Sequence, residues 1–217
     1  YKTSPHLRRW LVGILARVRQ QQRLVAHWNI SQTYQVSKQN SKEGTKSMRL
    51  LHGLCSFGKL WVKTAQRKPR EVPDYDYGYL PRRSRTGAIR TTARLSWRVK
   101  KHGISTVDTK HDMQNAFASV RHLQLDGAAR RLYQESDAEL LLQRHRRARF
   151  KIEAGGETIV MKNGEGNHMG DANAAVVFQE ACTVPVRYWQ QLHHEKYNNE
   201  LVACYPISGE MVDLSLR

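Results

Sequence analysis

The segment Asp112–Phe117 joins a carboxylate to a small residue and an aromatic residue four and five positions further on. Before it, the side chains of residues 104–111 alternate in type, which indicates a β-strand, and the sequence after it is compatible with a helix. A carboxylate at the end of a strand can ligate a divalent cation. Alternatively, Asp112 could do no more than cap the following helix.

A second segment, residues 77–84, reads Tyr-Gly-Tyr-Leu-Pro-Arg-Arg-Ser and places Arg82 and Arg83 directly before a predicted helix. The guanidinium group of arginine forms two-point hydrogen bonds with phosphate. These two side chains therefore suit a ligand that carries phosphate groups.

A third segment begins with a predicted β-hairpin, residues 150–152 and 158–161, joined across Gly155-Gly156. A glycine-containing turn then leads to Gly170-Asp171 and to an apolar helix predicted from Ala174 to Cys182. We expect Asp171 to be the N-cap of that helix.

In chain order, residues 77–84, 112–117 and 168–171 resemble the fingers motif, motif A and motif B of reverse transcriptases, most closely those of non-LTR elements and group II introns. The resemblance spans roughly residue 49 to the C-terminus. It implies a right-hand polymerase fold of the α/β (α+β) class, with fingers and a partial palm in which helices pack on a small sheet. It also implies that Asp112 is the magnesium ligand of motif A and that Phe117 screens the 2′ position of the nucleotide sugar.

The match to the family pattern is partial. The matching residues are Arg83, Ser84, Gly170 and Asp171. The departures are Arg82 in place of a frequent Gly, Met169 in place of Gln and Ala172 in place of Pro.

The paired carboxylates of motif C are missing, since no Asp-Asp occurs in the sequence. Nucleotidyl transfer by two metal ions needs carboxylates from two strands, because one Asp cannot hold two divalent ions about 4 Å apart. The nearest candidate is residues 210–213, Glu-Met-Val-Asp, with no aromatic residue before it. We therefore predict that Asp112 is an inactive remnant and that the chain holds no cofactor. Under the alternative, that this is the N-terminal part of an active reverse transcriptase, the cofactor would be Mg²⁺.

The helix predicted after Ser84 has two contrasting faces. The apolar stripe that we expect to be buried consists of Ile89, Ala93 and Trp97, with Leu95 and Val99 alongside. The cationic row consists of Arg90, Arg94, Arg98 and Lys101, at positions i, i+4, i+8 and i+11. Like charges at this spacing destabilise an isolated helix by roughly a few tenths of a kcal/mol per pair, so a bound polyanion would stabilise the row. A solvated polar face is the alternative.

A second basic cluster ends another predicted helix, which begins with a capping box at residues 136–139 and continues through residues 140–142. Residues 144–149 of this cluster contain four arginines and a histidine. Across the chain, the residues that we predict to contact RNA are Arg82, Arg83, Arg85, Arg90, Arg94, Arg98, Lys101, Arg144, Arg146 and Arg147.

The composition favours a polyanionic partner. The chain has 217 residues, with 36 Lys and Arg against 19 Asp and Glu and a net charge of +17. Such an excess is typical of proteins that bind nucleic acid, or less often an anionic membrane surface, although a basic protein without such a partner is the alternative. The three cysteines lie far apart, so we expect neither a disulfide framework nor a zinc site. No stretch is apolar enough to predict a membrane span.

The N-terminal 47 residues differ from the rest, and we predict a boundary between residues 1–47 and a reverse-transcriptase-like domain over residues 48–217. No acid precedes Glu43, and Trp10, Ile14 and Val18 share one face of an Arg-rich helix. This composition is typical of a mitochondrial targeting peptide, of a basic arm on RNA, or of a helix that packs on its own domain through those three residues. Residues 29–47 are polar and predict a linker or an exposed extension.

These patterns together predict a catalytically inactive, reverse-transcriptase-derived protein that binds structured RNA as a component of a ribonucleoprotein. The transit-like N-terminus favours a mitochondrial location, and a mitochondrial ribosome with its rRNA and neighbouring proteins is the expected particle. Binding would rest on phosphate contacts and shape, with a steep salt dependence. A protein-interaction subunit whose basic surface is covered by another polypeptide is a further alternative.

Overall fold

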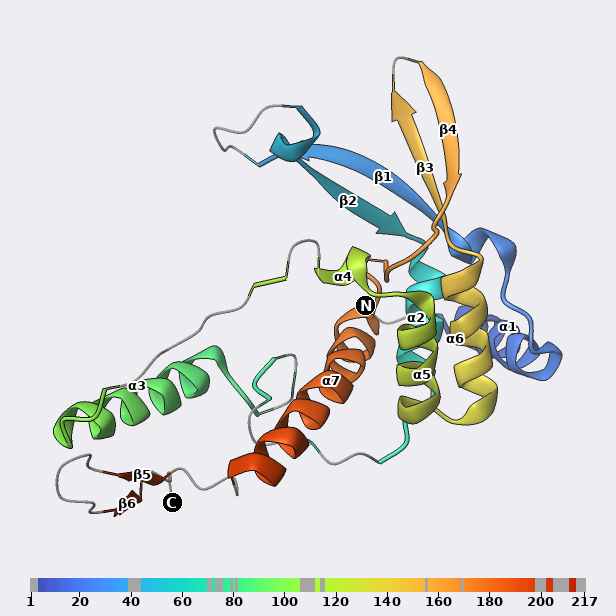
Figure 1. Ribbon diagram of the computed structural model, residues 1–217. Coiled ribbons are helices and arrows are strands. Elements are labelled where there is room, and N and C mark those ends of the chain that lie inside the picture. Colours follow the sequence, from blue (N-terminus) through green and yellow to red (C-terminus); the bar gives the residue numbers. More distant parts are fainter. Residues whose placement is uncertain are drawn as a thin grey trace. The chain divides into compact units, whose positions relative to one another are not determined.

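The computed structural model describes residues 4–38, 44–69, 72, 76–78, 80, 82–105, 112–113, 116–154, 156–168, 170–197, 202–204 and 211–213. In this part of the chain there are seven α-helices and a four-stranded mixed sheet, so the expected α/β class is confirmed (Figure 1). The chain forms two compact units. The first unit comprises Tyr1–Arg70 and Gln114–Ala181, and the second comprises Glu71–Met113 and Cys182–Arg217. Neither unit begins or ends at the predicted boundary after residue 47.

The sheet of the first unit has the strand order β2-β1-β3-β4 (Figure 1). Its strands are β1 (Ile30–Ser37), β2 (Met48–Leu54), β3 (Arg149–Ala154) and β4 (Glu157–Lys162). β1 lies between an antiparallel partner, β2, and a parallel partner, β3. The antiparallel β3–β4 pair confirms the predicted hairpin.

Residues 29–47 were predicted to form a linker or an exposed extension, but residues 30–37 of this range form the strand β1. Its two buried positions hold Ser31 and Thr33, whereas Tyr34 and Val36 on the other face are exposed, so burial does not follow the apolar residues of the segment. Both hydroxyls have partners, because Ser31 Oγ donates to the carbonyl oxygen of Arg149 and Thr33 Oγ1 lies 3.2 Å from Nδ1 of His52. Hydrogen bonding to neighbouring strands thus allows a polar segment to form one of the two inner strands of the sheet.

The helices of the first unit form its core. They are α1 (Pro5–Gln21), α2 (Ser56–Thr64), α4 (Ala116–Ser119), α5 (His122–Leu132), α6 (Glu135–Arg146) and the start of α7 (Ala174–Tyr197), with short 3-10 turns at Ala26–Asn29 and Gly44–Ser47. α5 and α6 pack side by side (Figure 1). The largest fully buried side chains include Trp61, Leu125, Tyr133, Leu140, Leu141 and Leu142.

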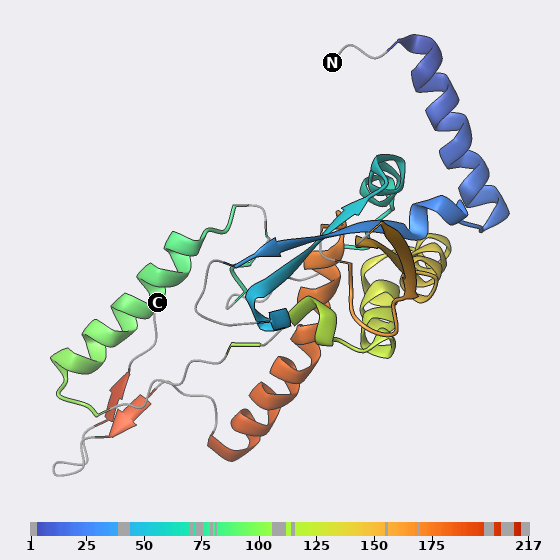
Figure 2. The same cartoon turned by 90° about the horizontal axis from the view of Figure 1, so that it is seen from above.

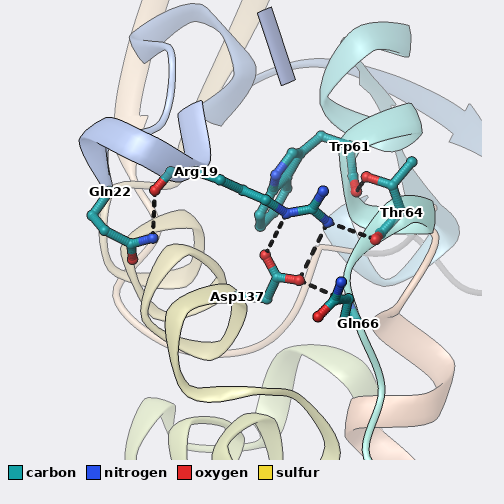
Figure 3. Close-up of polar contacts among 6 residues, drawn as sticks. All are labelled: Arg19, Gln22, Trp61, Thr64, Gln66 and Asp137. Carbon is teal, nitrogen blue, oxygen red and sulfur yellow. Dashed lines mark hydrogen bonds and ion pairs between the residues drawn. The ribbon is translucent and has the colours of Figure 1, made fainter. Parts of the chain in front are cut away.

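α6 begins at Glu135 with Gln134 as its N-cap residue, so the predicted capping box at residues 136–139 is wrong. Asp137 instead lies buried against α1 and α2 (Figure 3). Its Oδ1 accepts a 3.0 Å hydrogen bond from Nε of Arg19, and its Oδ2 accepts a 2.7 Å hydrogen bond from the backbone N–H of Gln66. Asp137, which we predicted to lie in a local capping box, instead forms hydrogen bonds with residues that are distant in the sequence.

The C-terminal half of α1 is anchored in the same place. Arg19 also donates to the backbone carbonyl of Thr64, at the end of α2 (Figure 3). Val18 is buried, and Ile14 packs against the core cluster. The prediction that this helix packs on its own domain is confirmed for these two residues, whereas Trp10 keeps 57% of its surface exposed.

The second unit contains α3 (Arg85–Lys101), α7 from Cys182 onward, and the antiparallel pair β5 (Val202–Cys204) and β6 (Met211–Asp213). The predicted burial of Ile89, Ala93 and Trp97 is wrong: all three are exposed, Trp97 by 61%, and only Val99 of the predicted stripe is buried. Helical spacing shows which apolar residues share one face of a helix, but it does not show whether another element packs against that face.

None of the helices in the described ranges is both long enough and apolar enough to cross a membrane. Within these ranges Cys55 and Cys182 are free thiols. Residues 106–111, most of the strand predicted before Asp112, lie outside the described residues, as do Tyr79, Pro81 and Met169 of the motifs.

Candidate nucleic-acid interface

The fingers-like segment fixes the start of α3. Ser84 is the N-cap residue, and its Oγ accepts a 3.1 Å hydrogen bond from the backbone N–H of Gly87. Arg83 donates to the carbonyl oxygen of Asp76, and its guanidinium carbon lies 5.8 Å from the ring centroid of Tyr77. The Tyr77 hydroxyl in turn lies 3.1 Å from Oγ1 of Thr91. Arg83 is therefore a half-buried positioning residue that holds the approach to α3.

Arg82, next to it, is exposed and has a backbone φ of 64°. This left-handed conformation favours glycine, because any side chain with a Cβ costs about 1–2 kcal/mol there. The position is the one at which the reverse transcriptase pattern frequently has Gly. Arg82 thus combines a left-handed backbone conformation with a guanidinium group that is exposed to solvent.

The cationic row of α3 lies largely in solvent. Arg85, Arg90, Arg94 and Lys101 are exposed, and Arg98 is half-buried. The helix contains no Asp or Glu. Lys101 places its Nζ 5.2 Å from the ring centroid of the exposed Trp97. A 17-residue helix that contains no acid and exposes Arg85, Arg90, Arg94 and Lys101 is a surface on which phosphate groups would be favourably bound.

The second predicted cluster, at the end of α6, has a different arrangement. Arg144 is buried and pairs with Asp171, with both side chains 3% exposed. Arg146 pairs with Asp126 through a 2.6 Å contact from Nη2 to Oδ2. Arg147 alone of the three is exposed without such an ion pair among the described residues. Arg144 is therefore part of the internal structure, whereas Arg146 and Arg147 lie at the surface.

Asp171 is not the N-cap that we predicted, because α7 begins three residues later at Ala174. Its carboxylate accepts hydrogen bonds from Nε of Arg144 and from the backbone N–H of Ala172. Arg144 also donates to the carbonyl oxygen of Trp28. The acid of the motif B-like segment therefore holds α6, the turn before β1 and the start of α7 together.

Two buried imidazoles surround this ion pair. Burial, with a smaller contribution from nearby Arg144, lowers the pKa of both His145 and His168 to about 4. Asp171 acts in the opposite direction on each pKa, but too weakly to reverse the effect of burial. The rings of His168 and Phe150 are stacked with their centroids 4.9 Å apart. These residues form a neutral, packed environment at neutral pH.

Phe117, the last residue of the motif A-like segment, lies in the first unit beside the turn that precedes the motif B-like segment. The half-buried Phe117 packs its ring against Phe178 of α7, with centroids 4.9 Å apart. The backbone N–H of Asn167 donates to the carbonyl oxygen of Phe117, and that of Gly166 donates to Val120. A Cβ on Gly166 would lie 2.6 Å from backbone atoms of Ala118, so only glycine permits this approach.

Asp112 belongs to the second unit and is exposed. Among the described residues, no three His, Cys, Asp or Glu side chains gather into a group that could hold a metal ion. Asp112 lies in the second unit and Phe117 in the first. The structure therefore does not define the distance between these two motif A residues.

Sequence reasoning missed the acids that neutralise the α6 cluster. Asp126 and Asp171 are 20 and 27 residues away from the arginines that they pair with. The sequence of residues 144–147 by itself does not indicate that either acid pairs with these arginines. Lys100, exposed in the last turn of α3, was also left out of the predicted interface, although its charge and position were visible in the sequence.

Comparison with known proteins assigns no family to the chain, since no protein-family model matches it and no curated protein matches its sequence.

Proposed function

We propose that this protein binds RNA through the cationic face of α3, as a reverse-transcriptase-derived scaffold without polymerase activity of its own. The observation that carries the proposal is the exposed row of basic side chains on a helix that contains no acid. Phosphate groups would neutralise this row, and contacts to the RNA backbone would give binding with little sequence preference. In this role the protein would be a structural component of a ribonucleoprotein, such as a mitochondrial ribosome.

Two features of the backbone support the reverse transcriptase ancestry. Arg82 adopts the left-handed conformation at the position where the family pattern has Gly. Phe117, at the end of the motif A-like segment, accepts a hydrogen bond from the backbone N–H of Asn167, directly before the motif B-like segment, and Gly166 is in close contact with Ala118. A chance occurrence of isolated motifs would not require them to be neighbours.

The test is binding of a structured RNA across a salt series. Arg90→Glu with Arg94→Glu removes two exposed cations and adds two anions on one face of α3. We expect at least about a tenfold loss of affinity at moderate salt and a shallower dependence on salt, for unrelated RNA sequences alike.

The matched control is Arg17→Glu with Arg23→Glu, which makes the same change in net charge at two exposed positions of the first unit. If the control weakens binding as much as the α3 variant does, only the overall charge matters and the α3 site is wrong. Unchanged affinity in the α3 variant, with its circular dichroism intact, would contradict the proposal directly.

One observation favours a second candidate, the N-terminal part of an active reverse transcriptase. Asp112 is exposed, as a carboxylate that binds a metal ion and a nucleotide must be. Primer extension with Mg²⁺ separates the two candidates. Extension that disappears in Asp112→Ala would establish the enzyme, whereas RNA binding without extension, unaffected by Asp112→Ala, supports the inactive scaffold.

A further inference from the structure

Four large apolar side chains lie exposed where α1 and α2 meet. Leu7 and Trp10 come from α1, and Phe57 and Leu60 from α2, with between 38% and 57% of each residue exposed. The rings of Trp10 and Phe57 meet edge to face with centroids 6.3 Å apart, which makes one continuous patch from the two helices. We call these four residues the α1–α2 surface.

The exposed residues of α1 continue an apolar stripe whose C-terminal part is buried in the core of the first unit. Further along α1, Ile14 and Leu15 pack against the core of the first unit, and Val18 is buried in it. Figure 2 shows the N-terminal half of the helix extending beyond the other elements of this unit. The same apolar face therefore leaves the protein core at about Leu11 and remains uncovered towards Leu7.

The helix that carries the patch is held firmly at its other end. Arg19 bonds both to Asp137 of α6 and to the last turn of α2 (Figure 3). The ion pair with Asp137 has a nitrogen–oxygen distance of 3.0 Å, and the acid is 2% exposed. Because this contact joins α1 to α2, it fixes the two helices relative to each other and presents their four apolar side chains together.

The charged side chains of α1 and α2 all have the same sign. Neither α1 nor α2 contains an Asp or Glu. Arg8, Arg9 and Lys63 are exposed, and Lys59 is half-buried. Aromatic and leucine side chains next to basic residues, on helices without acids, are typical of a helix surface that lies in the interface of an anionic bilayer.

We propose that the α1–α2 surface docks on an anionic lipid membrane, with Trp10 and Phe57 inserted among the headgroups and the flanking basic residues on lipid phosphates. RNA fits this surface less well, because phosphate contacts leave four uncovered apolar side chains unexplained. The proposal does not depend on RNA binding by α3.

The experiment uses the full chain, freed of nucleic acid, with phosphatidylcholine vesicles that contain or lack phosphatidylserine. We expect co-sedimentation with the phosphatidylserine vesicles only. Trp10→Ser should weaken it by about tenfold or more, since an inserted aromatic ring is lost. Arg8→Glu with Arg9→Glu should weaken it by about 30-fold or more, since each basic residue near an anionic surface contributes about fivefold.

Trp97→Ser is the matched control, because Trp97 is equally exposed on another helix without acids. It should leave vesicle binding unchanged. In a second readout, lipids brominated on their acyl chains should quench part of the tryptophan emission of the wild type, and this quenching should disappear in Trp10→Ser.

Three results would overturn the proposal. The first is a wild-type protein that does not bind the phosphatidylserine vesicles. The second is an equal effect, or no effect, of Trp10→Ser and Trp97→Ser. The third is a loss of duplex RNA binding in Arg8→Glu with Arg9→Glu while Trp10→Ser leaves vesicle binding intact, which would make α1 an RNA-binding arm.

Discussion

Two arginine clusters that look alike in sequence differ in the folded chain. At the end of α6, Arg144 and Arg146 are neutralised by Asp171 and Asp126, and Arg144 is buried. On α3, Arg90 and Arg94 are exposed on a helix that contains no acid at all. A run of arginines indicates an RNA-binding surface only when the folded chain brings no carboxylates to it.

The difference also separates two kinds of stabilisation. The α6 cluster contributes to the fold, because removing one member would leave a buried charge without a partner. The exposed Arg90 and Arg94 of α3 contribute nothing of this kind, and their like charges make the isolated helix less stable. The three predictions below test this contrast, from the largest expected effect to the smallest.

The largest effect is expected at Arg144. Arg144→Ala leaves the Asp171 carboxylate buried without its guanidinium partner and removes a hydrogen bond to the carbonyl oxygen of Trp28. We expect the free energy of unfolding, measured by urea denaturation, to fall by about 3–5 kcal/mol.

Arg90→Ala is the control for this experiment, because it truncates an exposed arginine on α3. It should change the free energy of unfolding by no more than about 0.5 kcal/mol. If both substitutions changed the free energy of unfolding equally, the α6 cluster would not differ from the α3 row in its contribution to stability.

The environment of the Arg144–Asp171 pair also predicts an acid-sensitive first unit. His145 and His168 have pKa values of about 4 in the folded chain, below the value of 6.5 for an unperturbed imidazole. The unfolded chain therefore binds more protons between these values, so stability falls as the pH drops from about 6.5 towards 4. Each ring accounts for about 3 kcal/mol at most.

Urea denaturation at several pH values measures this loss. His168→Gln should make the decline between pH 6.5 and 4 shallower, whereas His27→Gln, at an exposed position, should not change it. A decline that is identical in all three proteins would show that carboxylates alone account for the acid sensitivity.

The smallest effect is expected at the start of α3. Arg82 has a φ of 64°, so Arg82→Gly relieves an unfavourable backbone conformation, although glycine also loses more conformational entropy on folding. We expect a net gain in stability of about 0.5–1 kcal/mol, the size of the left-handed penalty less the entropy cost.

Thermal unfolding followed by circular dichroism measures this gain, with Arg85→Gly at the first helical position as the control that should destabilise. RNA affinity of Arg82→Gly should fall at the same time if the exposed guanidinium group contacts phosphate. A protein that is destabilised by Arg82→Gly would contradict the left-handed conformation.

Local patterns predicted the elements that depend on neighbours in the chain. The hairpin of β3 and β4, the helix after Ser84 and the helix beginning at Ala174 all follow from turn residues or spacing. The same local reading failed at β1, whose inward-facing Ser31 and Thr33 are satisfied by atoms of β3 and β2. It also failed at Asp137, which bonds to Arg19 at a separation of 118 residues.

The sequence by itself determined the charge of this protein, its mixed α/β composition and the segments that resemble reverse transcriptase motifs, because these depend only on residue type and short-range order. Only the tertiary structure decided which arginines face solvent, which acids are buried beside them, and that Ile89 and Trp97 remain exposed while Val18 does not. Burial and ion pairing depend on which distant segments come into contact. A local sequence pattern does not identify the distant residue that will be the partner.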